Sequence, residues 1–182
     1  ELYFLSLISK NVKLYTEMIV SNAIIRGDRE KLLSFKKINN HVTLQLGGSD
    51  PKELAEACKI AEDYGYQEIN LNLGCPSKKV QKNKFGACLM KEPDLVGRCI
   101  DSMSSATKLP VSAKTRIGYN DLENFDFLKK FILKIKNSGS EKFIIHARRA
   151  ILTKLSPKQN LNIPPLNYDF VYKLKEEFKN NE

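Results

Sequence analysis

The sequence predicts an α/β fold of parallel strands, and three observations favour it. Strand-like and helix-like segments alternate along the 182 residues, in units of roughly 30–40 residues that are typical of βαβ structure. No Gly-x-Gly-x-x-Gly pattern follows the first strand, as it would in a dinucleotide-binding sheet. Polar side chains recur where predicted strands end. Because a whole eight-stranded barrel takes about 250 residues, we expect an incomplete (β/α)₈ TIM barrel with about five of its eight strands.

The first segments are predicted from the spacing of apolar residues. Residues 1–10 have the stripe of the last turns of a helix, and residues 14–20 are rich in strand formers. A polar stretch leads to residues 42–48, whose alternation and two closing glycines predict a second strand. Residues 49–53 carry capping residues and a first-turn proline, so a helix is expected from there to Gly65.

The central strand is expected at residues 68–73, where apolar and polar residues alternate up to Gly74. Cys75 follows in a tight turn, and Pro76 forbids further strand pairing. A side chain at the carboxyl end of a parallel barrel strand stands on the face where active sites are built. The ordinary alternative is a buried structural thiol, which is how we interpret Cys58 on the apolar side of the preceding helix.

The later segments continue the alternation and are predicted by the same signals. They are a lysine-rich loop at 77–85, a small apolar segment at 86–90, a helix beginning at 92–94, a strand and turn at 110–118, a helix capped by Asn120 or Asp121 and ending at Gly139, a strand at 142–148, a long loop at 149–166 and a helix at 168–179.

The composition is that of a globular chain with a basic surface. Of its residues, 42% are hydrophobic and 28% are charged, the net charge is +9 and the pI is about 9.3. Such a balance favours an acidic partner, and nucleic acid is the first candidate. A lysine-rich proteome would give the same balance, so the charge alone does not identify the partner.

The number and spacing of the cysteines and histidines limit the classes of protein to which the chain can belong. The four cysteines form no Cys-x-x-Cys pair and there are two histidines, so no metal site of the usual zinc spacing is expected. A reduced, intracellular setting is favoured, with the cytoplasm as the expected compartment and an organelle left open. No apolar run approaches membrane-spanning length. The first residues have no initiator Met and no signal-peptide pattern, so we expect the chain to come from inside a longer protein.

Four polar side chains share one position relative to the predicted strands. Gln45, Cys75, Lys114 and His146 lie at, or one turn from, the carboxyl ends of successive strands, which converge on one mouth in a parallel barrel. Core packing would place Val, Ile or Leu there. No carboxylate partner for His146 is evident, so a Cys-His-Asp hydrolase is not indicated. A lysine and a glutamine suit an electron-rich heterocycle such as a flavin, and a thiol beside it suits a general acid.

Several segments strongly resemble the tRNA-dihydrouridine synthases: residues 42–51, 68–77, 85–90, 114–118 and 144–148. Residues 155–166 resemble the A-type branch of that family, although Leu161 stands where that pattern has a basic residue. The resemblance covers nearly the whole chain. It implies an FMN-bearing barrel followed by a small helical domain, which reduces the C5–C6 double bond of selected uridines in tRNA at the expense of NADPH.

The resemblance also implies roles for single residues. Cys75 would protonate uracil C5 after hydride transfer from the flavin to C6. Gln45, Lys114 and His146 would contact the flavin. Asn72 would lie in the uridine-facing part of the pocket. The remaining two matches, at positions where the family meets substrate or tRNA, are Arg148 and Lys158.

A tRNA substrate also agrees with the physical chemistry. A uracil must be swung out of folded tRNA to reach a barrel mouth, at a cost of a few kcal/mol of stacking, and phosphate contacts must offset it. Basic residues occupy the predicted mouth loops: Lys78, Lys79, Lys82, Lys84, Arg148, Arg149, Lys154 and Lys158.

The resemblance leaves parts of the family unmatched. These are the first barrel strand, the last two strands with the phosphate-binding turns, and the helical tRNA-binding domain. We expect residues 1–182 alone neither to close a barrel nor to hold FMN firmly. Two other functions stay open from the sequence: a flavoprotein acting on a free pyrimidine, and a non-catalytic RNA-binding fragment.

Overall fold

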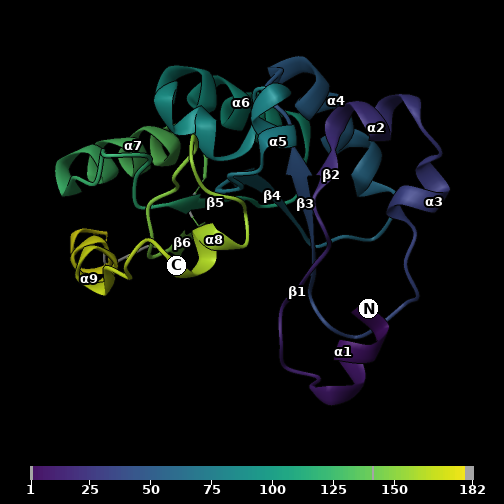
Figure 1. Cartoon of the computed structure of the whole chain (residues 1–182). Coiled ribbons are helices and arrows are strands. Elements are labelled where there is room, and N and C mark those ends of the chain that lie inside the picture. Colours follow the sequence, from purple (N-terminus) through teal and green to yellow (C-terminus); the bar gives the residue numbers. More distant parts are fainter. Residues whose placement is uncertain (1, 141, 179–182) are drawn as a thin grey trace.

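A single parallel sheet forms the centre of the computed structural model, which describes residues 2–140 and 142–178 (Figure 1). Its strands are β1 (Leu14–Tyr15), β2 (Ile19–Val20), β3 (Val42–Gly47), β4 (Glu68–Leu73), β5 (Val111–Arg116) and β6 (Lys142–His146). They lie in the order β1-β3-β4-β5-β6, β2 also pairs with β3, and every pairing is parallel. The predicted incomplete parallel α/β barrel is confirmed.

The strand predicted at residues 14–20 is broken in two. β1 pairs with Val42 and Thr43, and β2 pairs with Leu46 and Gly47, so both pieces lie along the same edge of β3. Between them the hydroxyl oxygen of Thr16 accepts a hydrogen bond from the Gln45 backbone N–H, at 3.0 Å, in place of a ladder bond. Six short segments therefore correspond to the five expected strands.

Helices connect the strands and flank the sheet. Their bounds are α1 (Leu2–Ile8), α2 (Ser21–Arg26), α3 (Arg29–Leu33), α4 (Pro51–Glu62), α5 (Lys78–Lys82), the 3₁₀ helix η1 (Gly86–Lys91), α6 (Pro93–Ala106), α7 (Phe125–Asn137), α8 (Gln159–Asn162) and α9 (Tyr168–Glu177). The expected helix at 168–179 is α9, and its last predicted residue lies outside the described residues.

The structure corrects three local predictions. Segments 77–85 and 149–166, predicted as loops, contain the short helices α5 and α8, and Ser77 caps α5 by accepting from the Val80 N–H. Neither Asn120 nor Asp121 caps α7, because Asn124 does so by accepting from the Phe127 N–H. The Asn120 side chain instead accepts from the Leu152 N–H, a contact distant in sequence.

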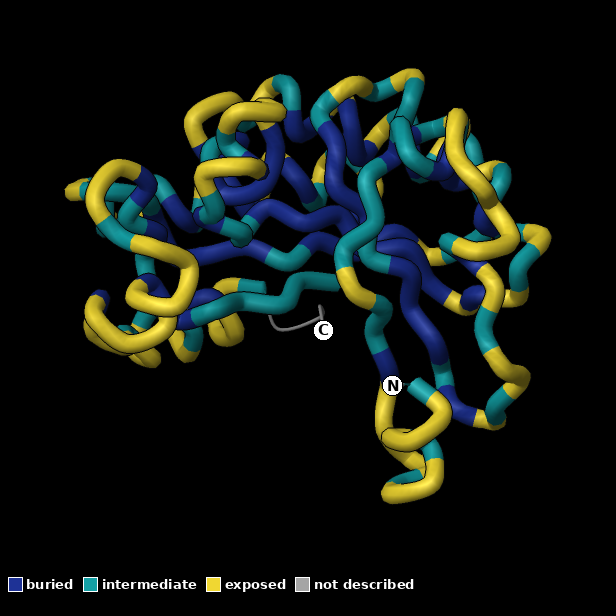
Figure 2. Tube along the Cα trace, turned by 45° about the vertical axis from the view of Figure 1, so that its right-hand side comes forward, coloured by how far each residue is buried: buried dark blue, intermediate teal, exposed yellow. Residues whose placement is uncertain are grey.

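The apolar core lies between one face of the sheet and the helices that cover it (Figure 2). Strand residues such as Leu44, Leu71 and Ala113 point into this layer and are fully buried, as are the inward faces of α4, α6 and α7. Cys58 belongs to this core and burial raises the pKa of its thiol to about 12, so its predicted place on the buried, apolar side of the helix is confirmed. None of the helices in the described ranges is long and apolar enough to cross a membrane.

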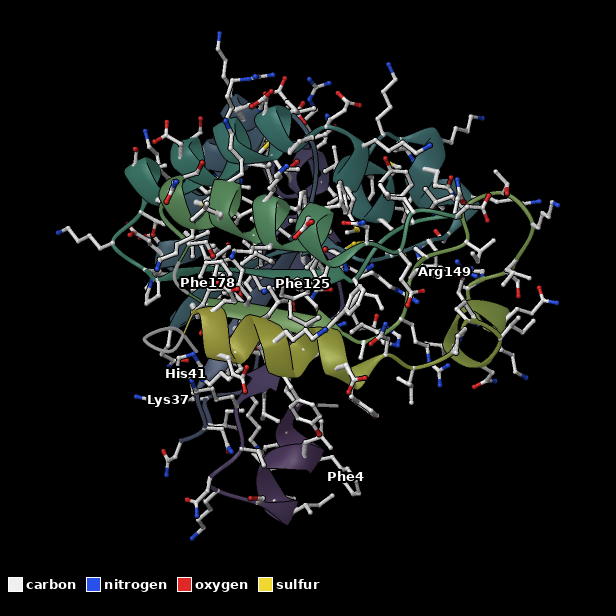
Figure 3. The ribbon with its side chains drawn as sticks, turned by 90° about the vertical axis from the view of Figure 1, so that its left-hand side faces the viewer. Phe4, Lys37, His41, Phe125, Arg149 and Phe178 are labelled. Carbon is white, nitrogen blue, oxygen red and sulfur yellow. The ribbon has the colours of Figure 1, made fainter. Side chains whose placement is uncertain are left out.

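The last helix extends the same layer beyond β6. Lys129 of α7 pairs with Glu177 of α9 at 2.7 Å. Figure 3 shows Phe125 and Phe178 lying between these two helices, and Phe125 meets Phe170 edge to face. α9 therefore packs on the outer side of the sheet and leaves the other face to polar side chains.

The other face of the sheet is polar along the middle strands. Because parallel neighbours in register point to the same side, Gln45 lines up with Asn70, Asn70 with Ser112, Asn72 with Lys114, and Arg116 with His146. Branched apolar residues usually fill the inside of a TIM barrel. This polar inner face is therefore unusual for a barrel, and the candidate site lies on it.

Candidate active site

Cys75 is held by its backbone at the carboxyl end of β4. Its N–H donates to the Asn72 side-chain oxygen at 3.0 Å, and its carbonyl accepts from the Ala87 N–H at 2.9 Å. The thiol is reduced and half-buried. The strand end and η1 thus clamp the cysteine from both sides while its side chain stays accessible.

Gly86 explains why η1 can approach so closely. Its φ is +74°, and a Cβ there would lie 2.6 Å from the Cys75 carbonyl oxygen and 2.6 Å from a methyl carbon of Val80. Only glycine fits this conformation and this distance without strain. The Phe-Gly-Ala segment therefore shapes the backbone around Cys75.

Gln45 and Asn72 are joined directly on the inner face. The Asn72 Nδ2 donates to Gln45 Oε1 at 2.8 Å, while Gln45 Nε2 donates to Asn70 Oδ1 at 2.9 Å. Since Asn72 also binds the Cys75 N–H, three of the predicted site residues form one hydrogen-bonded group.

Lys114 and His146 supply the nitrogen groups of the site. Burial is the first cause that lowers the pKa of Lys114, and nearby Arg116 adds to it, while Cys75 opposes it. Burial, followed by Arg116, Lys114 and Arg148, lowers the pKa of His146 to about 4. His146 is therefore a neutral imidazole near neutral pH, and Lys114 lies within electrostatic reach of the thiol.

Arg116 is a site residue that sequence reasoning missed. It is 3% exposed, its Nε donates to the Gly74 carbonyl at 3.1 Å, and its Nη1 donates to the carbonyls of Asn160 at 3.0 Å and Arg149 at 3.3 Å. It thereby ties the turn before Cys75 to the loop after β6. The alternation along β5 was the available signal, because it puts Arg116 on the same face as Lys114.

The two predicted substrate contacts differ in placement. Arg148 lies close enough to His146 and Arg116 to affect the pKa of each, and its Nη1 donates to the Pro164 carbonyl. Lys158 is exposed at the start of α8. Its loop is anchored by buried Asn160, whose side chain binds both the N–H and the carbonyl of Ile151.

Most of the basic residues predicted at the mouth point to solvent. Lys78, Lys79, Lys82 and Lys84 lie on and after α5, directly beyond Cys75, and α5 ends in basic residues. Arg149 differs, because its Nε lies 3.7 Å from Glu123. A run of cations therefore borders one side of the site.

A separate hollow of about 970 Å³ lies at the β1–β2 edge of the sheet. It is lined by residues of α1, β1, β2, α2 and α3 and of the segments between and after them, among them Leu5, Tyr15, Met18 and Phe35. None of the four predicted mouth residues lines it. The hollow is therefore distinct from the group of strand-end residues that the sequence predicts as the site.

Comparison with known proteins decides the family. The family model described as "Dihydrouridine synthase (Dus)" matches residues 2–180. The chain belongs to the dihydrouridine synthase family. Curated relatives named tRNA-dihydrouridine(20/20a) synthase include those of Synechocystis sp., 49% identical over 176 residues, and Pasteurella multocida, 51% identical over 176 residues; each match covers 97% of this chain and 53% or 54% of the relative.

A third curated relative of this dihydrouridine synthase chain matches with similar identity and coverage. The tRNA-dihydrouridine(20/20a) synthase of Escherichia coli O6:H1 is 51% identical over 177 residues, which cover 97% of this chain and 53% of that protein. The chain thus spans about half the length of the curated relatives it matches. The resemblance noted in the sequence is confirmed at the level of the family.

Proposed function

We propose that this chain is the catalytic portion of a tRNA-dihydrouridine synthase, which reduces uridines in tRNA to 5,6-dihydrouridine with FMN and NADPH. One observation carries the proposal: Cys75 stands at a strand end beside Gln45, Asn72 and Lys114 on the polar face of a half-barrel. The names of the curated relatives support tRNA as the substrate class and positions 20 and 20a as the target.

The donor set at the strand ends fits a flavin. Lys114 is a half-buried cation whose electrostatic neighbours are Arg116 and Cys75 rather than a carboxylate. A cation in such a place is costly and favours an electron-rich partner. Gln45 adds an amide, and His146 a neutral imidazole, on the same face. We propose these three residues as the flavin contacts.

Cys75 would act as the general acid of the reaction. FMN, when bound and reduced by NADPH, supplies the hydride that adds to uracil C6. Reduction of the C5–C6 double bond then needs one proton at C5, and we propose the Cys75 thiol as its source. Afterwards the thiolate must regain a proton from solvent, so uridine, NADPH and one proton yield dihydrouridine and NADP⁺. Lys114 lies where it would stabilise the transient thiolate.

The surroundings of the site suit a tRNA. Asn72 offers an amide to the uracil edge, and Arg148 stands beside His146. The lysines of α5, with Lys158 beyond, would contact phosphates and offset the cost of swinging out the base. We propose that further strands and a helical tRNA-binding domain of the full-length protein complete the barrel and the grip on tRNA.

The substrate class can be tested directly. The full-length protein, loaded with FMN, is given NADPH with either unmodified tRNA or free uracil. Dihydroorotate, which is already reduced at C5–C6, is tested separately with an electron acceptor in place of NADPH. We expect NADPH oxidation and dihydrouridine formation with tRNA alone. Turnover of the free pyrimidines without reduction of tRNA would instead support a pyrimidine flavoprotein. Tight tRNA binding without any reduction would support an RNA-binding protein that lacks catalysis.

A further inference from the structure

A continuous chain of side-chain hydrogen bonds crosses the inner face of the sheet. It starts at buried Glu68, whose Oε1 accepts from the Ser112 hydroxyl at 2.6 Å. Ser112 Oγ in turn accepts from Asn70 Nδ2 at 2.9 Å. From Asn70 the chain passes through Gln45 and Asn72 to the Cys75 N–H, as described above. Together these links connect one end of the strands to the other.

The direction of this chain is set at its Glu68 end. Lys142 Nζ lies 2.5 Å from Glu68 Oε2, and His41 Nε2 lies 3.5 Å from the same oxygen. A carboxylate paired in this way can only accept hydrogen bonds. Ser112 has one hydrogen and gives it to Glu68, so its oxygen must accept, and Asn70 must turn its NH₂ toward it.

The opposite end imposes the same direction. The backbone N–H groups of Gly74 and Cys75 can only donate, and both donate to Asn72 Oδ1, at 3.2 and 3.0 Å. Asn72 must therefore turn its NH₂ toward Gln45. Figure 3 shows His41, which lies 3.5 Å from Glu68, toward the left of the view and Arg149 toward the right. Glu68 begins β4 and Cys75 follows its last residue, so the two constraints act from opposite ends of that strand.

We propose that Asn70 and Ser112 are positioning residues that fix which end of the Gln45 carboxamide faces the mouth of the site. Gln45 and Asn72 each keep one amide hydrogen without a partner among the described residues. Both hydrogens are thereby offered as donors to carbonyl oxygens of a flat heterocycle. That Gln45 binds a flavin rests on the proposed function, whereas the orientation of the Gln45 carboxamide does not.

The variant Asn70→Asp tests this because it keeps the shape of the side chain. A protonated Asp donates to Ser112 and accepts from Gln45, as Asn does; an ionised Asp can only accept. Burial near Glu68 raises the pKa expected for such a group. The other charged groups that face this position are Lys114 on β5, Lys142 on β6 and His41 before β3. Thr43→Val is the matched control, since Thr43 is the register partner of Glu68 and its buried hydroxyl has no hydrogen bond among the described residues.

The measurement uses the full-length protein at about pH 5.5 and about pH 8, on either side of the raised pKa. Side-chain ¹⁵N NMR of Gln45, without FMN, reads the orientation alone; FMN affinity, from quenching of flavin fluorescence, reads its consequence. Because Asp in either protonation state still accepts from Gln45 Nε2, we expect Asn70→Asp to keep the orientation of the Gln45 carboxamide at both pH values. Asn70→Leu, which offers no acceptor, should shift the Gln45 signal at both. FMN affinity should fall about tenfold in Asn70→Leu, the order of one missing hydrogen bond, and should stay near the wild-type value in Asn70→Asp at the lower pH.

Further variants separate orientation from mere packing. Ser112→Thr should keep the wild-type signal and FMN affinity, Ser112→Ala should lose both at each pH, and Thr43→Val should follow the wild type. An Asn70→Leu protein that keeps the wild-type Gln45 signal and FMN affinity would overturn the proposal. If the Gln45 signal behaves as expected while the wild type neither binds FMN nor reduces tRNA, the positioning stands and the proposed function fails.

Discussion

At the scale of single residues, the state of His146 follows from its neighbours. Burial comes first and the cations Arg116, Lys114 and Arg148 follow, and together they lower the pKa of His146 from 6.5 to about 4. Protonating it would add a fourth positive charge to the same corner of the site. A neutral imidazole can both donate and accept, which suits a contact to a flavin ring better than a further cation does.

This shift makes a prediction about stability and pH. Between about pH 4 and 6.5 the unfolded chain binds a proton at position 146 and the folded chain does not, so acidification through that window lowers the free energy of unfolding. His146→Gln should remove this part of the pH dependence, measured by urea unfolding of the full-length protein across the window. His41→Gln is the control, and the account is contradicted if that variant, rather than His146→Gln, flattens the curve.

The sequence predicted those site residues whose position depends only on where a parallel strand ends. Gln45, Cys75, Lys114 and His146 were found because parallel strands bring their carboxyl ends to one side. Asn70 and Ser112 were missed because alternation along a strand does not say which face is solvent and which is barrel interior. Glu68, at the start of their hydrogen-bond chain, pairs with Lys142, which lies 74 residues further along the sequence and meets it only in the fold.

At the scale of elements, η1 and the turn after β4 form one unit. The Ala87 N–H binds the Cys75 carbonyl, and Gly86 allows the approach. The short helix α5 lies between them in sequence and carries the lysines past the mouth. The position of Cys75 thus depends on a backbone contact rather than on its own side chain.

Two glycines allow the effect of this close contact on stability to be measured. Gly86 (φ +74°) and Gly65 (φ +81°) share a left-handed backbone, but a Cβ meets nothing within 4 Å at Gly65 and meets Cys75 and Val80 at Gly86. Gly65→Ala should cost about 1–2 kcal/mol from backbone strain alone. Gly86→Ala should cost roughly 1–3 kcal/mol more from overpacking. Denaturant unfolding of both variants measures the difference, and equal losses of stability would show that η1 does not press on Cys75.

The elements themselves were predicted unevenly. The three middle strands and α4 were found because alternation and a capping residue are local signals, and Asp50 does cap α4. The break between β1 and β2 could not be foreseen, since it depends on a side-chain bond from Thr16 to a neighbouring strand. The cap of α7 was misplaced for a similar reason, because Asn120 is engaged by a distant backbone N–H.

At the scale of the whole molecule, the structure shows where the lysines behind the net charge of +9 lie. The lysines on α5 border the mouth, while those of α7 are partly paired, as Lys129 is with Glu177 and Lys134 with Asp94. A polyanion bound beside Cys75 would therefore meet several exposed cations of α5.

The electrostatic part of tRNA binding can be separated from general charge. In the full-length protein, the triple change of Lys78, Lys79 and Lys82 to Gln should weaken tRNA binding and reduce the slope of log K against log salt by about 0.7–0.9 for each phosphate that the variant no longer neutralises. The control changes Lys59, Lys108 and Lys130 to Gln, which removes the same charge from α4, the turn before β5 and α7. Filter binding over a salt series measures both, and identical slopes in the two variants would remove α5 from the tRNA surface.

The central claim is that Cys75 delivers a proton to uracil beside the proposed flavin contacts, and single-turnover formation of dihydrouridine in tRNA tests it most directly. The full-length Cys75→Ser protein, saturated with FMN and tRNA, should react about 10²–10⁴-fold more slowly than the wild type, the range for loss of a general acid. Cys88→Ser, which keeps a hydrogen-bond donor toward the Phe85 carbonyl, should react at nearly the wild-type rate. Wild-type speed in Cys75→Ser would contradict the account.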